Sequence, residues 1–412
     1  MTPNLQAGLN KLFSILNRDT VIDEVLPALS EQDWEEVEAA AHAQGLTLLL
    51  HDRLVGAESS VPGAMQERLH STFLKATARN MVMLHHASVM LEALRGRGLE
   101  VIVLKGLYLA EAVYPGIGLR IFDDIDLLLH RLDLPAALEV MRDLGYELST
   151  WYDPADPNCD IKHIPPLVKA DAPIVELHWA ILEEEEPFTI DVEGMWARSV
   201  PAEIAGVGVS GLSVEDLILH LSLHLTYQHR LAAGVRNLYD IDAVIRRGGV
   251  DWAQLVAAGR EWKAERVLWL TLRLLQEIAG TPLPAERLMQ LLPGQPDQEI
   301  IEEALWQLLH RGSGGVAITP DLAALGQAKG FAGKVRLVLD RVFIPRRILA
   351  REYNIDPRSI KIYAYYFVRF ARLMHTYRDS VRGLMKGEVG VVESAQRERA
   401  RGALNRWLGG VA

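Results

Sequence analysis

The feature that most constrains this chain is a pair of aspartates set two residues apart at the start of an apolar run. Asp124 and Asp126 are separated by one isoleucine, and Leu127–Leu129 follow at once. In a β-strand, residues i and i+2 project from the same face, so the two carboxylates would lie about 7 Å apart along one side. Asp is disfavoured in strands, and like charges on one face repel unless a cation lies between them. Because oxygen ligands of this kind suit Mg²⁺ with bound phosphates, the pair predicts a metal site.

The aspartates close a longer unit of about thirty residues. A strand predicted at 99–104 breaks at Lys105 and Gly106, a short helix-like piece follows, and the chain turns at Tyr114-Pro115-Gly116 before the Asp pair. Backbone N–H groups at a helix N-terminus, together with a lysine charge, make a good phosphate site. We therefore expect Lys105 and Gly106 to bind phosphate, and a simple strand-to-helix turn is the alternative.

This unit resembles the nucleotidyltransferases of the DNA polymerase beta superfamily, and within it a family usually described as uncharacterised nucleotidyltransferases. The resemblance covers about residues 90–290. Its motifs here are Leu104-Lys105-Gly106, Tyr114-Pro115, Gly118-Leu119-Arg120 and Asp124-Ile125-Asp126-Leu127-Leu128. It implies an α+β (mixed α/β) fold with a small mixed sheet, which binds a nucleoside triphosphate (NTP) and Mg²⁺ or Mn²⁺. It also implies that Asp124 and Asp126 are catalytic metal ligands and that Arg120 neutralises triphosphate charge.

The superfamily supplies a third carboxylate from a later strand, and Val175-Glu176-Leu177-His178-Trp179 fits that position. Glu176 would serve as a catalytic metal ligand, or as the base for the attacking hydroxyl. His178 lies on the same face of this strand, predicted at 174–181, and is a candidate for orienting Glu176 beside the nucleotide. The alternative for both residues is the exposed face of an edge strand.

Two histidines and one aspartate in the second half of the chain are further candidates. His220 and His224 lie four residues apart on a helix predicted at 214–228, a spacing at which two histidines can share an ion. The Glu of a His-Glu-x-x-His motif is missing, so packing is the other interpretation. The resembling family has a similar Leu-x-x-His helix, followed by a helix with Arg and Asp, here Arg236 and Asp240. The resemblance places His224 and Asp240 near the base or the acceptor.

Composition indicates an ordinary globular protein of a reducing compartment. With 412 residues, 49% apolar and 24% charged, the chain is long enough for two or three domains. Cys159 is the only cysteine, which excludes an internal disulfide and suits the cytoplasm. The N-terminus lacks the pattern of a secretory signal. No window of about 18 uninterrupted apolar residues exists, so no transmembrane segment is expected.

The order of these features predicts four regions along the chain. They are an N-terminal helical region (1–95), a nucleotidyltransferase α/β core (96–212), a helical subdomain (213–310) and a basic helical C-terminal region (311–412). In the first region, Ser30 followed by acidic residues predicts a helix that ends at Gly45, and Pro62 opens a long helix.

Two stretches around the third carboxylate are predicted from composition alone. Residues 151–173 are rich in Pro, Asp and Asn and are expected to form a long loop. A loop of this length beside a site is often functional, for example as a lid. From residue 187 onward we expect mostly helices, with a linker around Gly312–Gly315.

The net charge of −11 is distributed unevenly. From Lys329 to the end there are 18 Lys and Arg but 7 Asp and Glu, so the rest of the chain is strongly acidic. An acidic body argues against general nucleic-acid binding, which needs a basic face. The basic C-terminal region is the candidate for an anionic partner, which would be a membrane surface, a glycan precursor or RNA. A helical cap packed on the acidic body is the alternative.

These observations predict a metal-dependent nucleotidyltransferase. It would transfer a nucleotidyl group from an NTP to an unknown hydroxyl acceptor and release pyrophosphate. Most superfamily members carry Gly-Ser after the first strand, whereas this chain has Lys105-Gly106, so Lys105 would replace the Ser as a point charge on phosphate. Two other functions stay open: a non-catalytic nucleotide-binding regulatory module, which the missing Ser favours, and a toxin-like transferase that modifies tRNA or protein.

Overall fold

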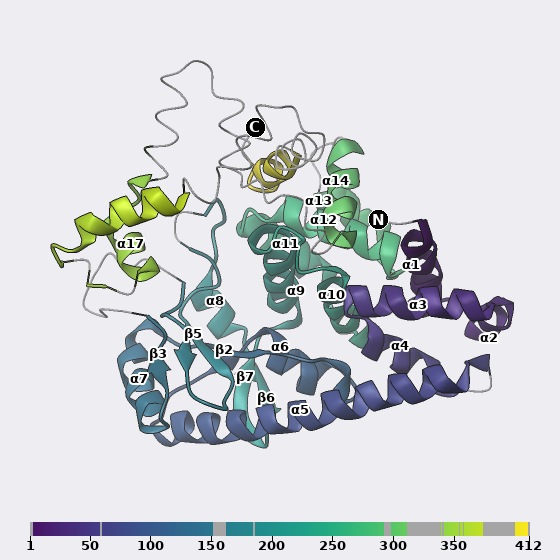
Figure 1. Cartoon of the computed structure of the whole chain (residues 1–412), viewed down its shortest axis with the longest axis horizontal. Coiled ribbons are helices and arrows are strands. Elements are labelled where there is room, and N and C mark those ends of the chain that lie inside the picture. The colour runs from purple at the N-terminus through teal and green to yellow at the C-terminus, as the bar shows by residue number, and fades with distance from the viewer. Residues whose placement is uncertain are drawn as a thin grey trace, which may run out of the picture.

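The computed structural model of the chain contains a mixed sheet covered by helices (Figure 1). It describes residues 3–57, 60–150, 162–183, 186–291, 298–310, 339, 342–353, 355–356, 358–373 and 400–410. The predicted linker around Gly312–Gly315 lies outside these residues, as does the 151–161 part of the predicted loop.

Seven strands form one sheet in the order β3-β4-β5-β2-β1-β7-β6. The strands are β1 (Ile102–Val103), β2 (Asp124–Leu128), β3 (Glu147–Leu148), β4 (Leu167–Val168), β5 (Ile174–His178), β6 (Val200–Ile204) and β7 (Val207–Gly211). Strand β2 runs parallel to β5 and antiparallel to β1, and β1 runs parallel to β7. The predicted mixed α/β fold is confirmed.

Helices surround the sheet and form most of the rest of the described chain. They are α1 (Pro3–Leu16), α2 (Ile22–Val25), α3 (Glu31–Gln44), α4 (Thr47–Leu54), α5 (Gly63–Gly96), α6 (Lys105–Tyr108), α7 (Leu134–Asp143), α8 (Val192–Ala197), α9 (Val214–Leu223), α10 (Val235–Arg247), α11 (Trp252–Glu261), α12 (Glu265–Ile278), α13 (Ala285–Leu291), α14 (Gln298–Leu309) and α17 (Arg346–Glu352). Residues 362–373 and 400–408 are also helical. A wider π-type turn, His224–Gln228, prolongs α9.

The boundaries of the N-terminal helices follow local sequence signals. Ser30 accepts a hydrogen bond from the Asp33 backbone N–H, and the Asp33 carboxylate accepts one from the Ser30 backbone N–H, so both unpaired donors are satisfied. Helix α3 ends at Gly45, whose φ of +70° is the left-handed conformation that glycine adopts at little cost. The long helix predicted after Pro62 is α5, which runs under both the sheet and the N-terminal helices (Figure 1).

One face of the sheet is apolar and is covered by α5 and α7. Alternate residues of the two central strands belong to a single buried cluster with these helices: Ile125, Leu127, Val175 and Leu177. The residues that alternate with them include Asp124, Asp126, Glu176 and His178. These must point to the opposite face. That opposite face therefore carries the predicted site.

The opposite face packs against the helical subdomain. Ile102 and Leu128 from the sheet share a second buried cluster with residues of α9 to α12 and with the N-terminal helices α1, α3 and α4. Gln44 at the end of α3 donates a hydrogen bond of 2.8 Å to the Leu309 carbonyl of α14. One continuous core thus connects the two ends of the described body.

The chain from residue 187 onward, predicted to be mostly helical, also contains a β-hairpin, β6–β7, so the prediction is wrong for residues 200–211. Its two-residue turn is Ala205-Gly206, with φ of +53° and +75°. Two positive φ values are what the favoured tight hairpin turns require. Strand β7 also pairs with β1, through Ile102 and Ser210. The hairpin therefore joins the sheet through a strand about a hundred residues away, which no local pattern reveals.

The predicted loop 151–173 is also wrong in part. Strand β4 lies within it and pairs with β5 through Leu167 and Val175, and with β3 on its other side. An isolated bridge between His163 and His178 extends the contact along β5. The strands predicted at 99–104 and 174–181 are present but shorter, as β1 and β5.

Candidate active site

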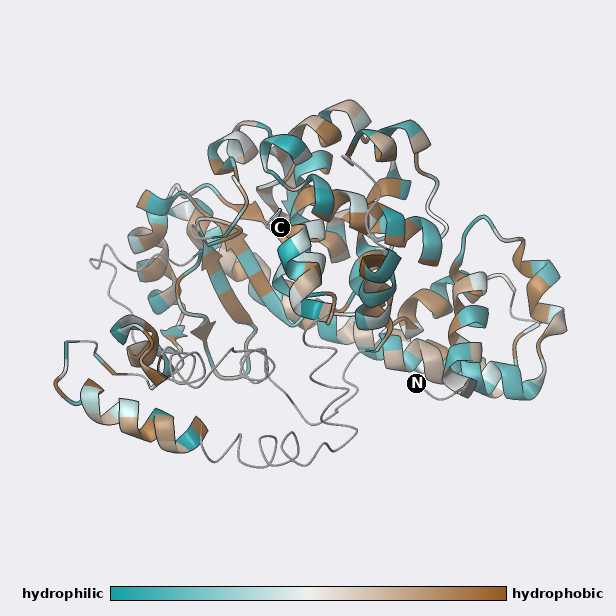
Figure 2. Cartoon of the chain, turned by 90° about the horizontal axis from the view of Figure 1, so that it is seen from above, coloured by the Kyte–Doolittle hydropathy of each residue, from teal (hydrophilic) through white to brown (hydrophobic). Residues whose placement is uncertain are grey.

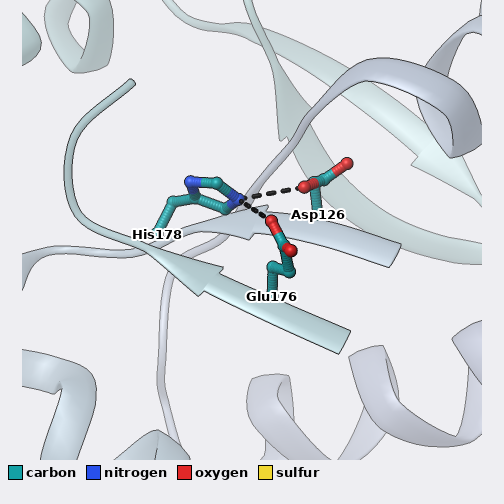
Figure 3. Close-up of side chains that lie close together, drawn as sticks. All are labelled: Asp126, Glu176 and His178. Carbon is teal, nitrogen blue, oxygen red and sulfur yellow. Dashed lines mark hydrogen bonds and ion pairs between the residues drawn. The ribbon is translucent and has the colours of Figure 1, made fainter. Parts of the chain in front are cut away.

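The parallel pairing of β2 with β5 brings together residues that lie fifty positions apart in sequence. In this register Asp126 faces Glu176 and Leu128 faces His178. Neighbouring strands are separated by about 4.8 Å, so directly paired side chains on one face are in reach of one another. The structure thus places Asp126, Glu176 and His178 in one cluster (Figure 3).

His178 bridges the two carboxylates. Its Nε2 lies 2.9 Å from Asp126 Oδ1 and 3.2 Å from Glu176 Oε2. Its Nδ1 is buried and has no hydrogen-bond partner among the described residues, so the proton is assigned to Nε2, which donates toward both acids. One ligand atom from each of the three residues lies within 4.8 Å of the other two.

Lys105 reaches the same carboxylate from the first turn of α6. Its Nζ lies 2.8 Å from Asp126 Oδ1. Its backbone has a φ of +46°, which is uncommon for a residue with a side chain and costs free energy that the surrounding contacts must offset. Next to it, a Cβ on Gly106 would lie 2.6 Å from Phe122 Cβ, so the chain passes Phe122 too closely for any other residue.

The four charged groups on this face, Lys105, Asp124, Asp126 and Glu176, shift one another's pKa values. Burial would lower the pKa of Lys105, but the charges of Asp126, Glu176 and Asp124 outweigh it and raise that pKa. Burial would raise the pKa of Asp126, but Lys105 and the His178 hydrogen bond hold it well below its usual range. The His178 hydrogen bond also lowers the pKa of Glu176. Both bridged carboxylates are therefore ionised at neutral pH.

Asp124 lies on the same face but is not part of the bridged cluster. Burial and the neighbouring Asp126 charge raise its pKa to about 6, and Lys105 opposes the rise. A carboxylate with this pKa carries a charge at neutral pH that is repelled by its surroundings. A bound cation would relieve that repulsion.

The sequence candidates Arg120 and Asp240 meet each other in a buried ion pair. Arg120 Nε lies 2.8 Å and 2.9 Å from the two carboxylate oxygens of Asp240, and the guanidinium also donates to the Ile121 carbonyl. Tyr114 donates its hydroxyl to Asp240 Oδ1 at 2.9 Å. Asp240 has only 1% of its surface exposed. In the structure, these residues join α10 to the segment before β2, and their role toward the nucleotide stays a prediction.

A set of histidines faces the carboxylates from the end of α9. His220 is buried, and its Nε2 has no partner among the described residues. His224 and His229 approach each other with 3.0 Å between their Nε2 atoms. Burial, and next the charge of Lys105, lower the pKa values of His220 and His224 well below the usual range. The structure thus places the candidate His224 beside the same charged face.

Three further residues near the carboxylates were not predicted from the sequence: Lys162, His163 and His229. The ring of His163 lies 4.9 Å from that of His178. Burial, and next the charge of Lys105, lower the pKa values of Lys162 and His229. Lys162 and His163 lie within the stretch predicted as a loop and are placed by contacts with β5, so no local signal marks them. His229 follows the predicted helix and had only its proximity to His224 as a signal.

The donor set fits a divalent cation. Carboxylate oxygens suit Mg²⁺ and Mn²⁺, and an imidazole nitrogen is accepted more readily by Mn²⁺ and other transition metals. Asp126 and Glu176 could supply ligand atoms, with His178 as a third when its Nε2 carries no proton, and Asp124 lies two residues from Asp126 on the same strand face. This is a site that could hold a cation against the phosphates of a nucleotide.

Comparison with known proteins assigns the family. Residues 30–280 match the sequence model of the family described as "Uncharacterised nucleotidyltransferase". The chain belongs to this family. The match spans α3 to α12 and the whole sheet, so all residues of the site lie within it. The protein is therefore a transferase enzyme of the nucleotidyltransferase class, as the resemblance in sequence implied.

A search of solved structures finds a distant likeness. The antibiotic-resistance factor ANT(2'')-Ia, known from a solution structure, aligns with 16% identity and a TM-score of 0.33. The alignment covers 48% of this chain and 98% of that one. No curated protein matches this nucleotidyltransferase in sequence.

Proposed function

We propose that this nucleotidyltransferase transfers a nucleotidyl group from an NTP to a hydroxyl acceptor in a reaction that depends on Mg²⁺ or Mn²⁺. The observation that carries the proposal is the juxtaposition of Asp126 with Glu176, bridged by His178, in a chain that belongs to a nucleotidyltransferase family. The acceptor oxygen forms a bond to the α-phosphorus, the bond from that phosphorus to the β-phosphate oxygen breaks, and pyrophosphate leaves. A carboxylate of the same face takes the proton of the acceptor hydroxyl.

Each residue of the site has a role in positioning this reaction. Asp124, Asp126 and Glu176 would hold the divalent ion, which when bound neutralises phosphate charge and stabilises the attacking and leaving oxygens. His178 keeps Glu176 and Asp126 ionised and oriented by its hydrogen bonds. Lys105, now paired with Asp126, supplies a positive charge for the phosphates at the first turn of α6.

The first experiment is a screen of the four NTPs, labelled at the α-phosphate, with cell extract as the source of acceptors. Transfer of label should require Mg²⁺ or Mn²⁺, and Asp126→Asn should reduce it at least about a hundredfold, because the removed charge is a proposed metal ligand. Asp123→Asn is the matched control, because this neighbouring carboxylate has 80% of its side chain exposed and pairs with Arg79 instead. Pyrophosphate release that survives replacement of Asp124, Asp126 and Glu176 by Ala would refute the proposal.

A non-catalytic nucleotide-binding module is the second candidate. The Lys105–Asp126 ion pair favours it, because a lysine held against the central carboxylate competes with a cation for the same oxygen. Titration calorimetry separates the two candidates. NTP binding without pyrophosphate release, under every acceptor condition tried, would support the regulatory module and contradict transfer.

A further inference from the structure

The C-terminal region contains a small helical unit of its own. Helix α17 and the helix at 362–373 enclose a core of Leu349, Ala350 and Ile362, each fully buried, with Tyr353 and Tyr366 among the residues packed around it. Tyr366 donates its hydroxyl to the Ile344 carbonyl at 2.8 Å. The pair of helices stands beside the body in both views (Figures 1 and 2). Such a unit has an inner side, which these contacts define, and an outer side.

The helix at 362–373 supplies Ile362 to this core, yet its outer side is also apolar. Arg369 is directed inward, has 6% of its surface exposed and forms an ion pair with Glu352 of α17. Tyr363, Phe367 and Phe370 are directed outward, with 51%, 78% and 45% of their surfaces exposed. These three residues follow the i, i+4, i+7 spacing, so they lie on one side of the helix. A helix side that faces water is ordinarily polar, so this exposed apolar side indicates an interaction surface.

The same unit exposes further apolar and basic side chains. Val368 on the same helix is 49% exposed, Ile360 just before it 84%, and Ile348 on α17 48%. The unit also exposes four basic residues: Arg346, Arg358, Lys361 and Arg372. Residues 342–373 contain seven Lys and Arg but two Asp and Glu. One of those acids, Glu352, is already occupied by Arg369 and Arg372.

We propose that this outer side, defined by Tyr363, Phe367 and Phe370 with their basic neighbours, binds the surface of an anionic lipid bilayer. Aromatic and aliphatic side chains would enter the boundary between headgroups and acyl chains, while Arg346 and Lys361 would face anionic headgroups. The Arg346 guanidinium lies 4.6 Å from the centre of the Tyr363 ring, so charge and aromatic surface are side by side. Among the described residues, no helix is long and apolar enough to cross a membrane, so the contact would be peripheral.

A lipid surface explains the combination of groups better than other anionic partners do. An RNA would use the arginines and could stack on aromatic rings, but it offers nothing to exposed Ile348, Ile360 and Val368. The acidic body of a second copy would pair with the basic residues, but it would not bury so large an apolar side. Only a bilayer presents negative charge above an apolar layer.

The test is flotation of the full-length protein with vesicles. The protein should float with vesicles of equal parts phosphatidylcholine and phosphatidylglycerol, and much less with phosphatidylcholine alone. The double substitution Phe367→Glu with Phe370→Glu should lower the bound fraction at least about tenfold, because two aromatic side chains that would enter the bilayer are replaced by charges. Leu132→Glu is the matched control, because this leucine is 92% exposed on the body and should not matter.

The charge contribution is tested separately. Lys361→Ala and Arg358→Ala should each weaken binding to the anionic vesicles about fivefold, as expected for one basic residue near an anionic surface. The same vesicles at high salt should bind the parent protein less tightly. Near-ultraviolet circular dichroism checks that each variant is folded. These measurements need no catalytic turnover, so they are independent of the proposed transfer reaction.

Three results would overturn the proposal. In the first, the parent protein fails to float with the anionic vesicles. In the second, the Phe367→Glu, Phe370→Glu variant floats as well as the parent. In the third, the protein self-associates or shifts a labelled RNA without lipid and loses that behaviour on the same double substitution, which would assign the surface to a second copy or to RNA.

Discussion

Asp124 and Asp126 carry the same side chain on the same face of β2, yet their surroundings shift their pKa values in opposite directions. Asp126 accepts hydrogen bonds from Lys105 and His178, which hold its pKa well below the usual range after outweighing its burial. Asp124 has no such donor among the described residues to offset burial and the Asp126 charge, so its pKa rises from 3.8 to about 6. The difference has a measurable consequence for stability.

The raised pKa of Asp124 predicts that removing its charge increases the free energy of unfolding by an amount that depends on pH. Between pH 3.8 and about 6, the folded protein keeps a proton on Asp124 that the unfolded chain releases, so the contribution of this group to the free energy of unfolding falls as pH rises through that window and is constant above it. The variant Asp124→Asn does not lose this stability as pH rises. Between pH 4 and pH 6.5, its free energy of unfolding should therefore increase relative to that of the parent protein, by about 1 to 2 kcal/mol after allowing for partial exposure.

Urea unfolding in EDTA at several pH values measures this gain. Asp123→Asn removes a neighbouring charge whose side chain is mostly exposed, and it should show no such trend. A difference between Asp124→Asn and parent that stays flat from pH 4 to pH 7 would contradict the assigned pKa.

At the scale of elements, short segments before β2 are fixed by contacts with helices far along the chain. Tyr114 and Arg120 both bond to Asp240 on α10. Asn80 on α5 donates to the carbonyls of Ile117 and Arg120 at 2.6 Å and 2.8 Å. The turn that leads into the Asp pair is thus held from two sides.

Asp240→Ala should destabilise the fold before it affects nucleotide binding. The substitution leaves the buried Arg120 guanidinium without its carboxylate, which should cost about 3 to 5 kcal/mol in the free energy of unfolding. Arg247→Ala, at the exposed end of the same helix, should change it by less than about 0.5 kcal/mol. If Asp240→Ala instead raised the KM for NTP with the melting temperature unchanged, Arg120 and Asp240 would be nucleotide contacts.

Gly106 is predicted to be irreplaceable for a steric reason. An added Cβ would lie 2.6 Å from Phe122 Cβ, so Gly106→Ala should cost about 1 to 3 kcal/mol and displace the first turn of α6 with Lys105. At Gly116 the nearest atom would be 3.8 Å away, so Gly116→Ala is the matched control and should be nearly neutral. Equal melting temperatures for the two variants would show that the Phe122 contact is not tight.

At the scale of the whole molecule, the N-terminal helices and the helical subdomain share one core. Leu12 on α1 is fully buried in the same cluster as residues of α9 to α12. Arg246 on α10 forms ion pairs with Asp242 and, at 3.5 Å, with Asp19 in the N-terminal region. The regions predicted as 1–95 and 213–310 are therefore in contact, although their sequence boundaries stay a prediction.

Leu12→Ala should destabilise the body as one unit. The cavity should cost about 2 to 5 kcal/mol, and the unfolding transition of the N-terminal helices should coincide with loss of metal binding at the sheet. Leu132→Ala removes a leucine that is 92% exposed and should be neutral. Thermal unfolding followed both by circular dichroism and by metal binding tests this, and two separate transitions would show that the regions fold independently.

Local sequence signals predicted the ends of individual elements and the chemistry of one strand. Ser30 and Gly45 set the ends of α3 through hydrogen bonds and φ values that depend only on nearby residues. The alternation of Asp124 and Asp126 with apolar residues placed both carboxylates on one strand face, because the side-chain period of a strand is fixed at two. These signals act over a few residues, so they are readable without a fold.

Which distant residues meet depends on the packing of the whole sheet and its helices. The β2–β5 register paired Asp126 with Glu176, and a shift of one residue would have turned Glu176 and His178 to the opposite face. That register depends on burying Val175 and Leu177 against α5 and α7, which is a property of the assembled core. The hairpin β6–β7 and the Arg120–Asp240 pair arise in the same way, because strand pairing and burial of charge are settled by partners about a hundred residues away.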